Sequence, residues 1–135
     1  MATIGNITFA CAEPDALATF WAVILEYELE DIPPPLRDAL EDAGHDPSDG
    51  RAISDPNGDG PRLFFKRMEK TPTEQIPIHL DLYVEDREAA VAAFVTQGAT
   101  EIETKSLDLG AHEQVWTVLE DPEGNGFCVS APQHQ

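Results

Sequence analysis

The stretch that decides the fold is Ile76-Pro77-Ile78-His79-Leu80-Asp81-Leu82-Tyr83-Val84-Glu85-Asp86. Polar and apolar residues alternate in it, so that His79, Asp81 and Tyr83 share one side. A period of two predicts a strand with one apolar face and one polar face. Asp86 is a typical N-cap, and apolar residues then recur at helical spacing until Gly98. The sequence therefore predicts a strand that leads into a helix, with an imidazole and a carboxylate on its polar face.

The same unit occurs earlier in the chain. Residues 4–11 alternate like a strand, and Pro14 suits the first turn of a helix. An apolar stripe follows at helical spacing, formed by Leu17, Phe20, Trp21, Ile24 and Leu25. An offset of 73 residues places Asn6 with His79 and Trp21 with Phe94. The chain therefore contains an internal repeat, and the stripe predicts that Trp21 is a core residue.

Short strands follow each predicted helix. Residues 51–54 and 62–67 follow the first, and residues 100–104, 114–119 and 126–130 follow the second. Each group contains an Asp-Pro-x-Gly turn, at 55–58 and at 121–124. We therefore expect one α+β domain over residues 1–135, built from two modules at about 1–70 and 76–131. The helices, at 14–26 and 87–97, should lie on the outer faces of the sheets.

A short insertion interrupts the first module at about residues 33–50. Three prolines at 33–35 precede a helical pattern that ends at Gly44. A short, weakly anchored helix suits a lid over a cavity, since lids come from the less stable parts of a structure. It suits a surface decoration equally well.

The charge of the chain is strongly negative. It carries 26 acidic and 8 basic residues, which gives a formal net charge of −18. Such a surface repels phosphate backbones and anionic lipid, so nucleic acid and membranes are not expected partners. The charge indicates either a highly soluble surface or adaptation to a high-salt cytoplasm, where counterions screen self-repulsion.

The sequence also predicts where the protein is located and whether its cysteines form a disulfide. No apolar run is long enough to span a membrane, and the first residues lack the regions of a signal peptide, so we expect a cytoplasmic protein. Cys11 and Cys128 lie far apart within apolar runs. Free thiols are therefore expected, not a disulfide framework.

Three segments together resemble a known family. Pro61-Arg62-Leu63-Phe64-Phe65-Lys66-Arg67, Ile78-His79-Leu80-Asp81-Leu82 and Asp121-Pro122-Glu123-Gly124-Asn125-Gly126-Phe127-Cys128 are similar to the glyoxalase-like branch of the vicinal oxygen chelate superfamily. That superfamily includes glyoxalase I, extradiol dioxygenases, fosfomycin-resistance enzymes and bleomycin-binding proteins. The resemblance implies paired βαβββ modules that form a curved mixed sheet around a ligand cleft. It also implies a homodimer.

Enzymes of that superfamily usually hold a divalent metal with two protein positions from each module. His79 falls on one of these positions, whereas Asn6 and Cys128 fall where a histidine and a carboxylate are usual. Residues 62–68 offer no Asp, Glu or His for the remaining position. We therefore expect no metal ligands and no cofactor. The alternative is zinc recruited by His79 and Cys128 with help from Asp81.

Two functional hypotheses remain. The first is a protein that binds an unidentified small molecule in the cleft between its modules without the usual metal. The second is a lyase, isomerase or oxygenase of the same superfamily, in which His79 and Asp81 are catalytic. His79 itself suits a metal ligand, a general base or a polar cavity residue. The expected ligand-binding residues are Asn6, Phe64, Phe65, His79, Asp81, Tyr83 and Cys128.

Overall fold

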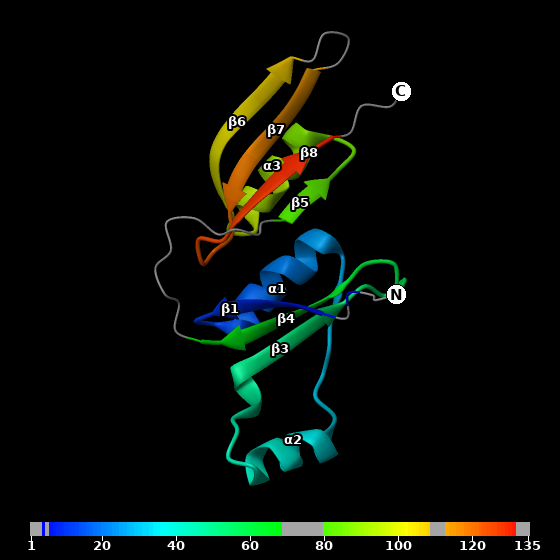
Figure 1. Cartoon of the computed structure of the whole chain (residues 1–135), viewed down its shortest axis with the longest axis vertical. Coiled ribbons are helices and arrows are strands. Elements are labelled where there is room, and N and C mark those ends of the chain that lie inside the picture. Colours follow the sequence, from blue (N-terminus) through cyan, green and yellow to red (C-terminus); the bar gives the residue numbers. More distant parts are fainter. Residues whose placement is uncertain (1–3, 5, 69–79, 109–112, 132–135) are drawn as a thin grey trace. The chain divides into compact units, whose positions relative to one another are not determined.

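The computed structural model describes residues 4, 6–68, 80–108 and 113–131. The chain divides into two compact units, Met1–Thr71 and Pro72–Gln135, which are called module 1 and module 2 below (Figure 1). No helix within the described ranges is both long enough and apolar enough to cross a membrane.

Module 1 contains a mixed sheet of four strands in the order β1-β4-β3-β2. Strands β1 and β4 are parallel, and the other neighbours are antiparallel. Its elements in chain order are β1 (Asn6–Cys11), α1 (Pro14–Leu25), β2 (Glu28–Leu29), α2 (Pro34–Asp42), the 3-10 turn η1 (Pro47–Asp49), β3 (Gly50–Ser54) and β4 (Arg62–Arg67).

Module 2 repeats this topology with the sheet order β5-β8-β7-β6. Strands β5 and β8 are parallel, and the other neighbours are antiparallel. Its elements are β5 (Leu80–Tyr83), α3 (Arg87–Thr96), β6 (Thr100–Asp108), β7 (Glu113–Glu120) and β8 (Gly126–Ser130). The predicted pair of βαβββ modules is therefore confirmed.

Aromatic rings form the core of module 1 between α1 and the sheet. The Trp21 ring meets Phe9 edge-on with the ring centroids 5.7 Å apart, and it meets Phe20 edge-on at 5.5 Å. Phe9 in turn lies 5.1 Å from Phe65 on the neighbouring strand. Trp21 is only 1% exposed, which confirms its prediction as a core residue. The face of the sheet that carries Phe9 and Phe65 is therefore the face that α1 covers.

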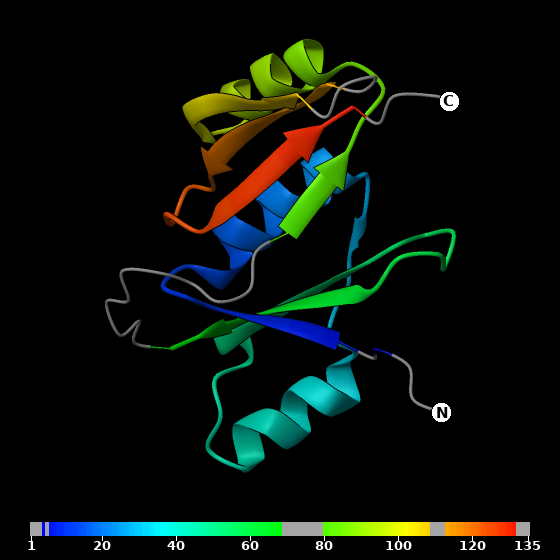
Figure 2. The same ribbon diagram turned by 45° about the horizontal axis from the view of Figure 1, so that its top comes forward.

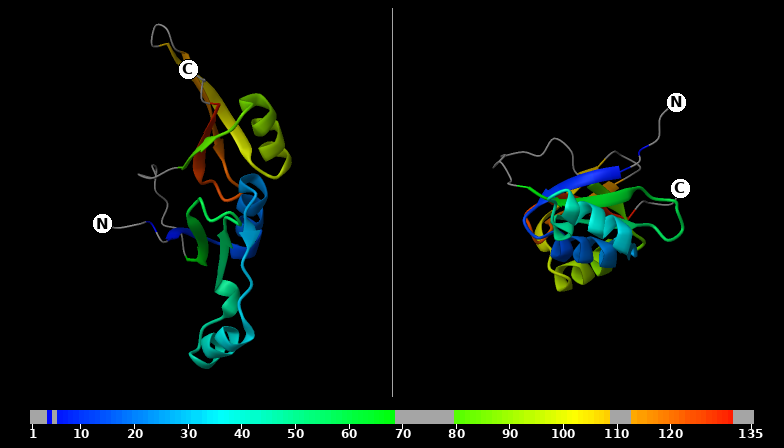
Figure 3. Two further views of the ribbon diagram at one scale, coloured as in Figure 1. Left: turned by 90° about the vertical axis from the view of Figure 1, so that its right-hand side faces the viewer. Right: turned by 90° about the horizontal axis from the view of Figure 1, so that it is seen from below.

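The core of module 2 lies between α3 and its sheet. Phe94 of α3 lies 6.4 Å from Phe127 of β8, and Phe127, Val129 and Leu119 are buried. Figures 1 and 3 show α3 against one face of these strands. The side chain of Asp86 accepts a hydrogen bond from the Ala89 backbone N–H at 3.1 Å, which confirms the predicted N-cap.

Between β2 and β3, module 1 contains the helix α2 and the 3-10 turn η1. Most side chains of α2 are exposed, and the helix contacts η1 of the same insertion. Figure 2 shows α2 standing away from the strands of module 1. Two features were not predicted: the short strand β2, and the length of β6, which continues to Asp108. A register shift between Glu101 and Glu103 bulges β6.

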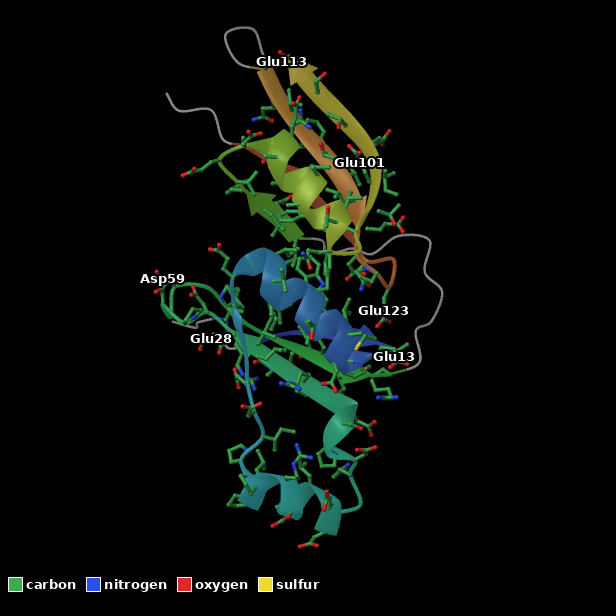
Figure 4. All side chains as sticks on the ribbon, turned by 180° about the vertical axis from the view of Figure 1, so that it is seen from behind. Glu13, Glu28, Asp59, Glu101, Glu113 and Glu123 are labelled. Atoms are coloured by element: carbon green, nitrogen blue, oxygen red, sulfur yellow. The ribbon has the colours of Figure 1, made fainter. Side chains whose placement is uncertain are left out.

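Acidic side chains occur in both modules. Figure 4 labels six of them, at the start of α1, on three strands and in two loops: Glu13, Glu28, Asp59, Glu101, Glu113 and Glu123.

Candidate functional site

Each sheet has one face opposite its helix, called its open face. In module 1 the register pairs Asn6 with Arg62 and Thr8 with Phe64. These residues alternate with Phe9 and Phe65, whose rings lie on the α1 side, so they belong to the open face. The full set on β1 and β4 is Asn6, Thr8, Ala10, Arg62, Phe64 and Lys66.

Arg62 is the centre of a polar network on this open face. Its Nε and Nη2 atoms donate to the two carboxylate oxygens of Glu30 at 2.8 and 3.0 Å. Its Nη1 donates to Oδ1 of Asn6 at 2.8 Å. The hydrogen bonds from Arg62 hold the pKa of Glu30 below its ordinary value. Glu30 and Asn6 thus hold the Arg62 guanidinium in place on the open face of module 1.

Phe64 covers the neighbouring part of the same face. A Cβ atom added to Gly50 would lie 2.5 Å from Cζ of Phe64, so the ring occupies the space that Gly50 leaves. The Arg62 guanidinium lies 5.9 Å from the centroid of this ring, within the range of a cation–π contact. Large side chains of module 1 therefore fill their own open face.

Phe65 requires a correction. It was expected to bind ligand together with Phe64, but adjacent residues of a strand point to opposite faces. Its side chain is 0% exposed and packs against Phe9 on the α1 side. We therefore assign Phe65 to the core of module 1 and remove it from the candidate site.

The open face of module 2 includes two parallel rows across the four strands. One row runs Tyr83–Ser130–Trp116–Lys105 from β5 to β6. The next row runs Asp81–Cys128–Val118–Glu103. The buried residues of β7 and β8, which alternate with these, face α3. Asp81, Tyr83 and Cys128, three of the expected ligand-binding residues, thus share one face.

The two central strands differ in the size of their open-face residues. Thr8 pairs with Phe64 in module 1, and Asp81, which is 73 residues after Thr8, pairs with Cys128 in module 2. By this equivalence β4 and β8 occupy the same place in their sheets. The open-face residues of β4 are Arg62, Phe64 and Lys66, and those of β8 are Gly126, Cys128 and Ser130. The middle of the module 2 face therefore has small side chains where module 1 has large ones.

The two rows of the module 2 face carry two carboxylates, Asp81 and Glu103, and one amine, Lys105. Lys105 Nζ lies 3.2 Å from a carboxylate oxygen of Glu103, so an acidic partner offsets its charge. Burial raises the pKa of the Cys128 thiol, Asp81 raises it further, and Lys105 partly opposes them. The thiol is therefore protonated at neutral pH and serves as a neutral, half-buried surface.

His79 lies outside the residues that the structure describes, as does His112. Asn6 and Phe64 lie on the open face of module 1. Within the described ranges, no group of three or more His, Cys, Asp or Glu residues is placed to hold a metal ion. Oδ1 of Asn6 accepts a hydrogen bond from the Arg62 guanidinium, which is a cation. The donor set on this face therefore does not fit a divalent metal.

The comparisons with known proteins agree with this fold. The sequence model of the glyoxalase-like domain matches residues 6–130. The chain belongs to the glyoxalase-like domain family. It is thereby a member of the vicinal oxygen chelate superfamily, as its sequence motifs indicated. No protein of curated function matches the sequence of this glyoxalase-like protein.

Solved structures support the assignment at the level of the fold. A glyoxalase/bleomycin resistance protein/dioxygenase family enzyme from Burkholderia phytofirmans PsJN is 18% identical, with a TM-score of 0.68 over 96% of this chain and 98% of that chain. A member of the same superfamily from Sphaerobacter thermophilus DSM 20745 is 17% identical, with a TM-score of 0.63 over 98% of each chain. At such identities the likeness concerns the fold alone.

Several open-face residues were missed by the sequence analysis. Glu30 follows the unrecognised strand β2, and it is 32 residues away from Arg62 in the chain. Trp116 lies in a strand that carries apolar residues on both faces, so alternation gave no signal for it. Ser130 became relevant only through its register with Tyr83 and Trp116.

Proposed function

We propose that this glyoxalase-like protein binds a small organic molecule on the open face of module 2 without a metal ion. The observation that carries the proposal is the size difference between β4 and β8. Gly126, Cys128 and Ser130 leave room in the middle of the module 2 face, and Trp116 and Tyr83 flank that room with aromatic surface. Ligand sites typically combine such apolar surface with a few polar groups, here the Asp81 carboxylate and the thiol of Cys128.

A screen of small molecules by thermal shift tests this proposal. Ligands of the wild-type protein should fail to bind Ser130→Phe, because the added ring fills the space between Tyr83 and Trp116 on the open face. Ala92→Phe is the matched control, since it adds the same ring at an exposed position of α3 in the same module. Unchanged binding by Ser130→Phe would overturn the proposal.

The enzymatic alternative, a lyase, isomerase or oxygenase that uses His79, makes a different prediction. A protonated Cys128 thiol is a weak nucleophile, so this residue does not favour covalent catalysis. A ligand recovered unchanged after prolonged incubation with the protein supports binding alone. A product whose formation disappears in His79→Ala supports the enzyme instead.

We further propose that the protein is a cytoplasmic homodimer. The edge strands of each described sheet support this, because open edges are usually covered by a partner. Light scattering at micromolar concentration should give about twice the 14.8 kDa of one chain. A mass equal to one chain would contradict the dimer.

A further inference from the structure

The helix α2 carries an apolar stripe that the described part of module 1 leaves largely exposed. Its members are Leu36, Ala39, Leu40 and the C-cap residue Ala43, whose i, i+3, i+4, i+7 spacing places them on one face of the helix. Leu36 is 52% exposed, and of the four only Leu40 is half-buried. Figure 2 shows α2 standing away from the strands of its own module.

A helix as short as α2 depends on packing for its stability. Isolated helices of fewer than about 12–15 residues are marginal in water, and α2 has nine residues. The N-cap residue, Pro33, makes no side-chain capping hydrogen bond. Glu41 and Asp42 lie in the last turn, where the negative end of the helix dipole disfavours them. The apolar stripe therefore has to supply most of the stabilisation, through contact with a partner.

The stripe is complementary to a second copy of itself. Two α2 helices can pack antiparallel around a twofold axis that passes between Ala39 and Leu40. Leu36 then lies opposite the partner's Ala43, and Leu40 lies opposite the partner's Ala39. Each large side chain thus meets a small one, so the helix axes can approach to about 8 Å, the short end of the usual range.

The charges of α2 also favour an antiparallel partner. Such a partner places its Arg37, which lies in the first turn, beside the last turn that carries Glu41 and Asp42. It also places the positive end of its own helix dipole there. Asp38 lies on the side of the helix away from the stripe and does not enter the contact. An antiparallel second copy therefore supplies the positive charge that the last turn of α2 lacks.

We propose that two copies of this chain associate through α2, packed antiparallel on the α2 of the partner. This inference rests on the proposed homodimer and names its contact surface. Each helix is only about 14 Å long, so the contact buries less than the about 800 Å² per partner of a standard interface. The net charge of −18 on each chain opposes association until salt screens it. The dimer should therefore dissociate at micromolar concentrations and tighten with added salt.

Engineered cysteines test the antiparallel geometry. Ala39 lies next to the twofold axis, so two copies of Ala39→Cys fall within the Cα separation of about 4.4–6.8 Å that a disulfide spans. Two copies of Leu36→Cys are about 10 Å apart along the helix axes and cannot join. An oxidant added to the full-length protein should therefore cross-link Ala39→Cys far more than Leu36→Cys. It should also cross-link it far more than Ala92→Cys, a control at an exposed position of α3. Equal cross-linking of the three variants would overturn the inference.

A charge placed in the stripe tests its contribution to the dimer. Ala39→Glu buries a carboxylate against the partner's Leu40 twice in each dimer, so the dissociation constant should rise at least about tenfold. Ala92→Glu is the matched control, because it adds the same charge at an exposed position of module 2 and should leave the constant unchanged. Sedimentation at about 0.5 M salt measures both variants. Equal dissociation constants for the two variants would overturn the inference.

The failure of this inference can be distinguished from failure of the proposed homodimer. If the wild type sediments as a single chain at every concentration and salt, the homodimer and this inference both fall. If the wild type is a dimer that Ala39→Glu does not weaken, the dimer stands on another surface and only this inference fails. If Ala39→Glu weakens the binding of ligands from the screen and leaves the dimer intact, α2 is a lid, which also overturns the inference.

Discussion

Thr117→Val should destabilise module 2 although it barely changes the shape of the core. Thr117 of β7 is 0% exposed, and its hydroxyl accepts a hydrogen bond from Nη1 of Arg87 at 2.7 Å. The same hydroxyl lies 2.9 Å from that of Thr104 on β6. Arg87 is the first residue of α3, so this oxygen ties the helix to two strands. Valine fills the same space without the oxygen.

The expected cost follows from the two lost bonds. A hydrogen bond from a charged donor contributes about 1.5–3 kcal/mol, and one between neutral groups about 0.5–1.5 kcal/mol. Burial of the polar hydroxyl itself costs about 1 kcal/mol or more, so its removal offsets part of the lost stability. The Arg87 side chain, 20% exposed, can regain some contact with water. We therefore expect a net loss of about 2 kcal/mol in the free energy of unfolding.

Urea unfolding followed by circular dichroism measures this loss. Thr104→Val is the matched control, because it removes only the neutral bond and should cost about 1 kcal/mol. The double variant should lose less than the sum of the two single variants, since both remove the same Thr104–Thr117 bond. A loss below about 0.5 kcal/mol for Thr117→Val, or a larger loss for Thr104→Val, would refute the reasoning.

Three further predictions concern pH, salt and metal. Because Arg62 lowers the pKa of Glu30, the stabilisation from this pair is present above the unfolded pKa of a glutamate and is lost as the pH falls through the lower folded value. Unfolding curves between about pH 6 and pH 3 should therefore fall less steeply for Glu30→Gln than for the wild type; parallel curves would contradict this. If the acidic surface is an adaptation to salt, the melting temperature should climb from low salt into the molar range, whereas a flat or falling curve would leave only solubility. Elemental analysis should find no stoichiometric divalent metal, and an equimolar metal that disappears in His79→Ala would favour the metalloenzyme.

Local sequence patterns predicted most of the helices and strands. Alternation assigned the faces of β5 correctly, since Leu80 and Leu82 pair with buried Phe127 and Val129. The strand β2 escaped prediction because it is two residues long and forms through its pairing with β3, which no local pattern encodes. The extension of β6 to Asp108 likewise depends on its partner β7.

The candidate site was less accessible to sequence reasoning, because it depends on register. Phe64 and Phe65 are adjacent and chemically identical, so only the contact between Phe9 and Phe65 decides which ring faces the helix. In the same way, Asp81 and Tyr83 were recognisable as polar-face residues, but their neighbours across the sheet were not. Cys128 and Ser130 enter the candidate site only through the pairing of β5 with β8.

The internal repeat allows the side chains on each face of the two sheets to be compared at equivalent positions. On the helix side the modules agree in class: Trp21 and Phe94 both contact an aromatic residue of the sheet, because each helix needs a packed core beneath it. On the open side β4 carries large residues and β8 small ones at equivalent positions. Packing against the helix of the same module cannot account for this difference, since both sets lie on the opposite face of their sheets. A requirement for room on one sheet and not on the other would account for it, and this supports the proposal that the binding surface lies on module 2.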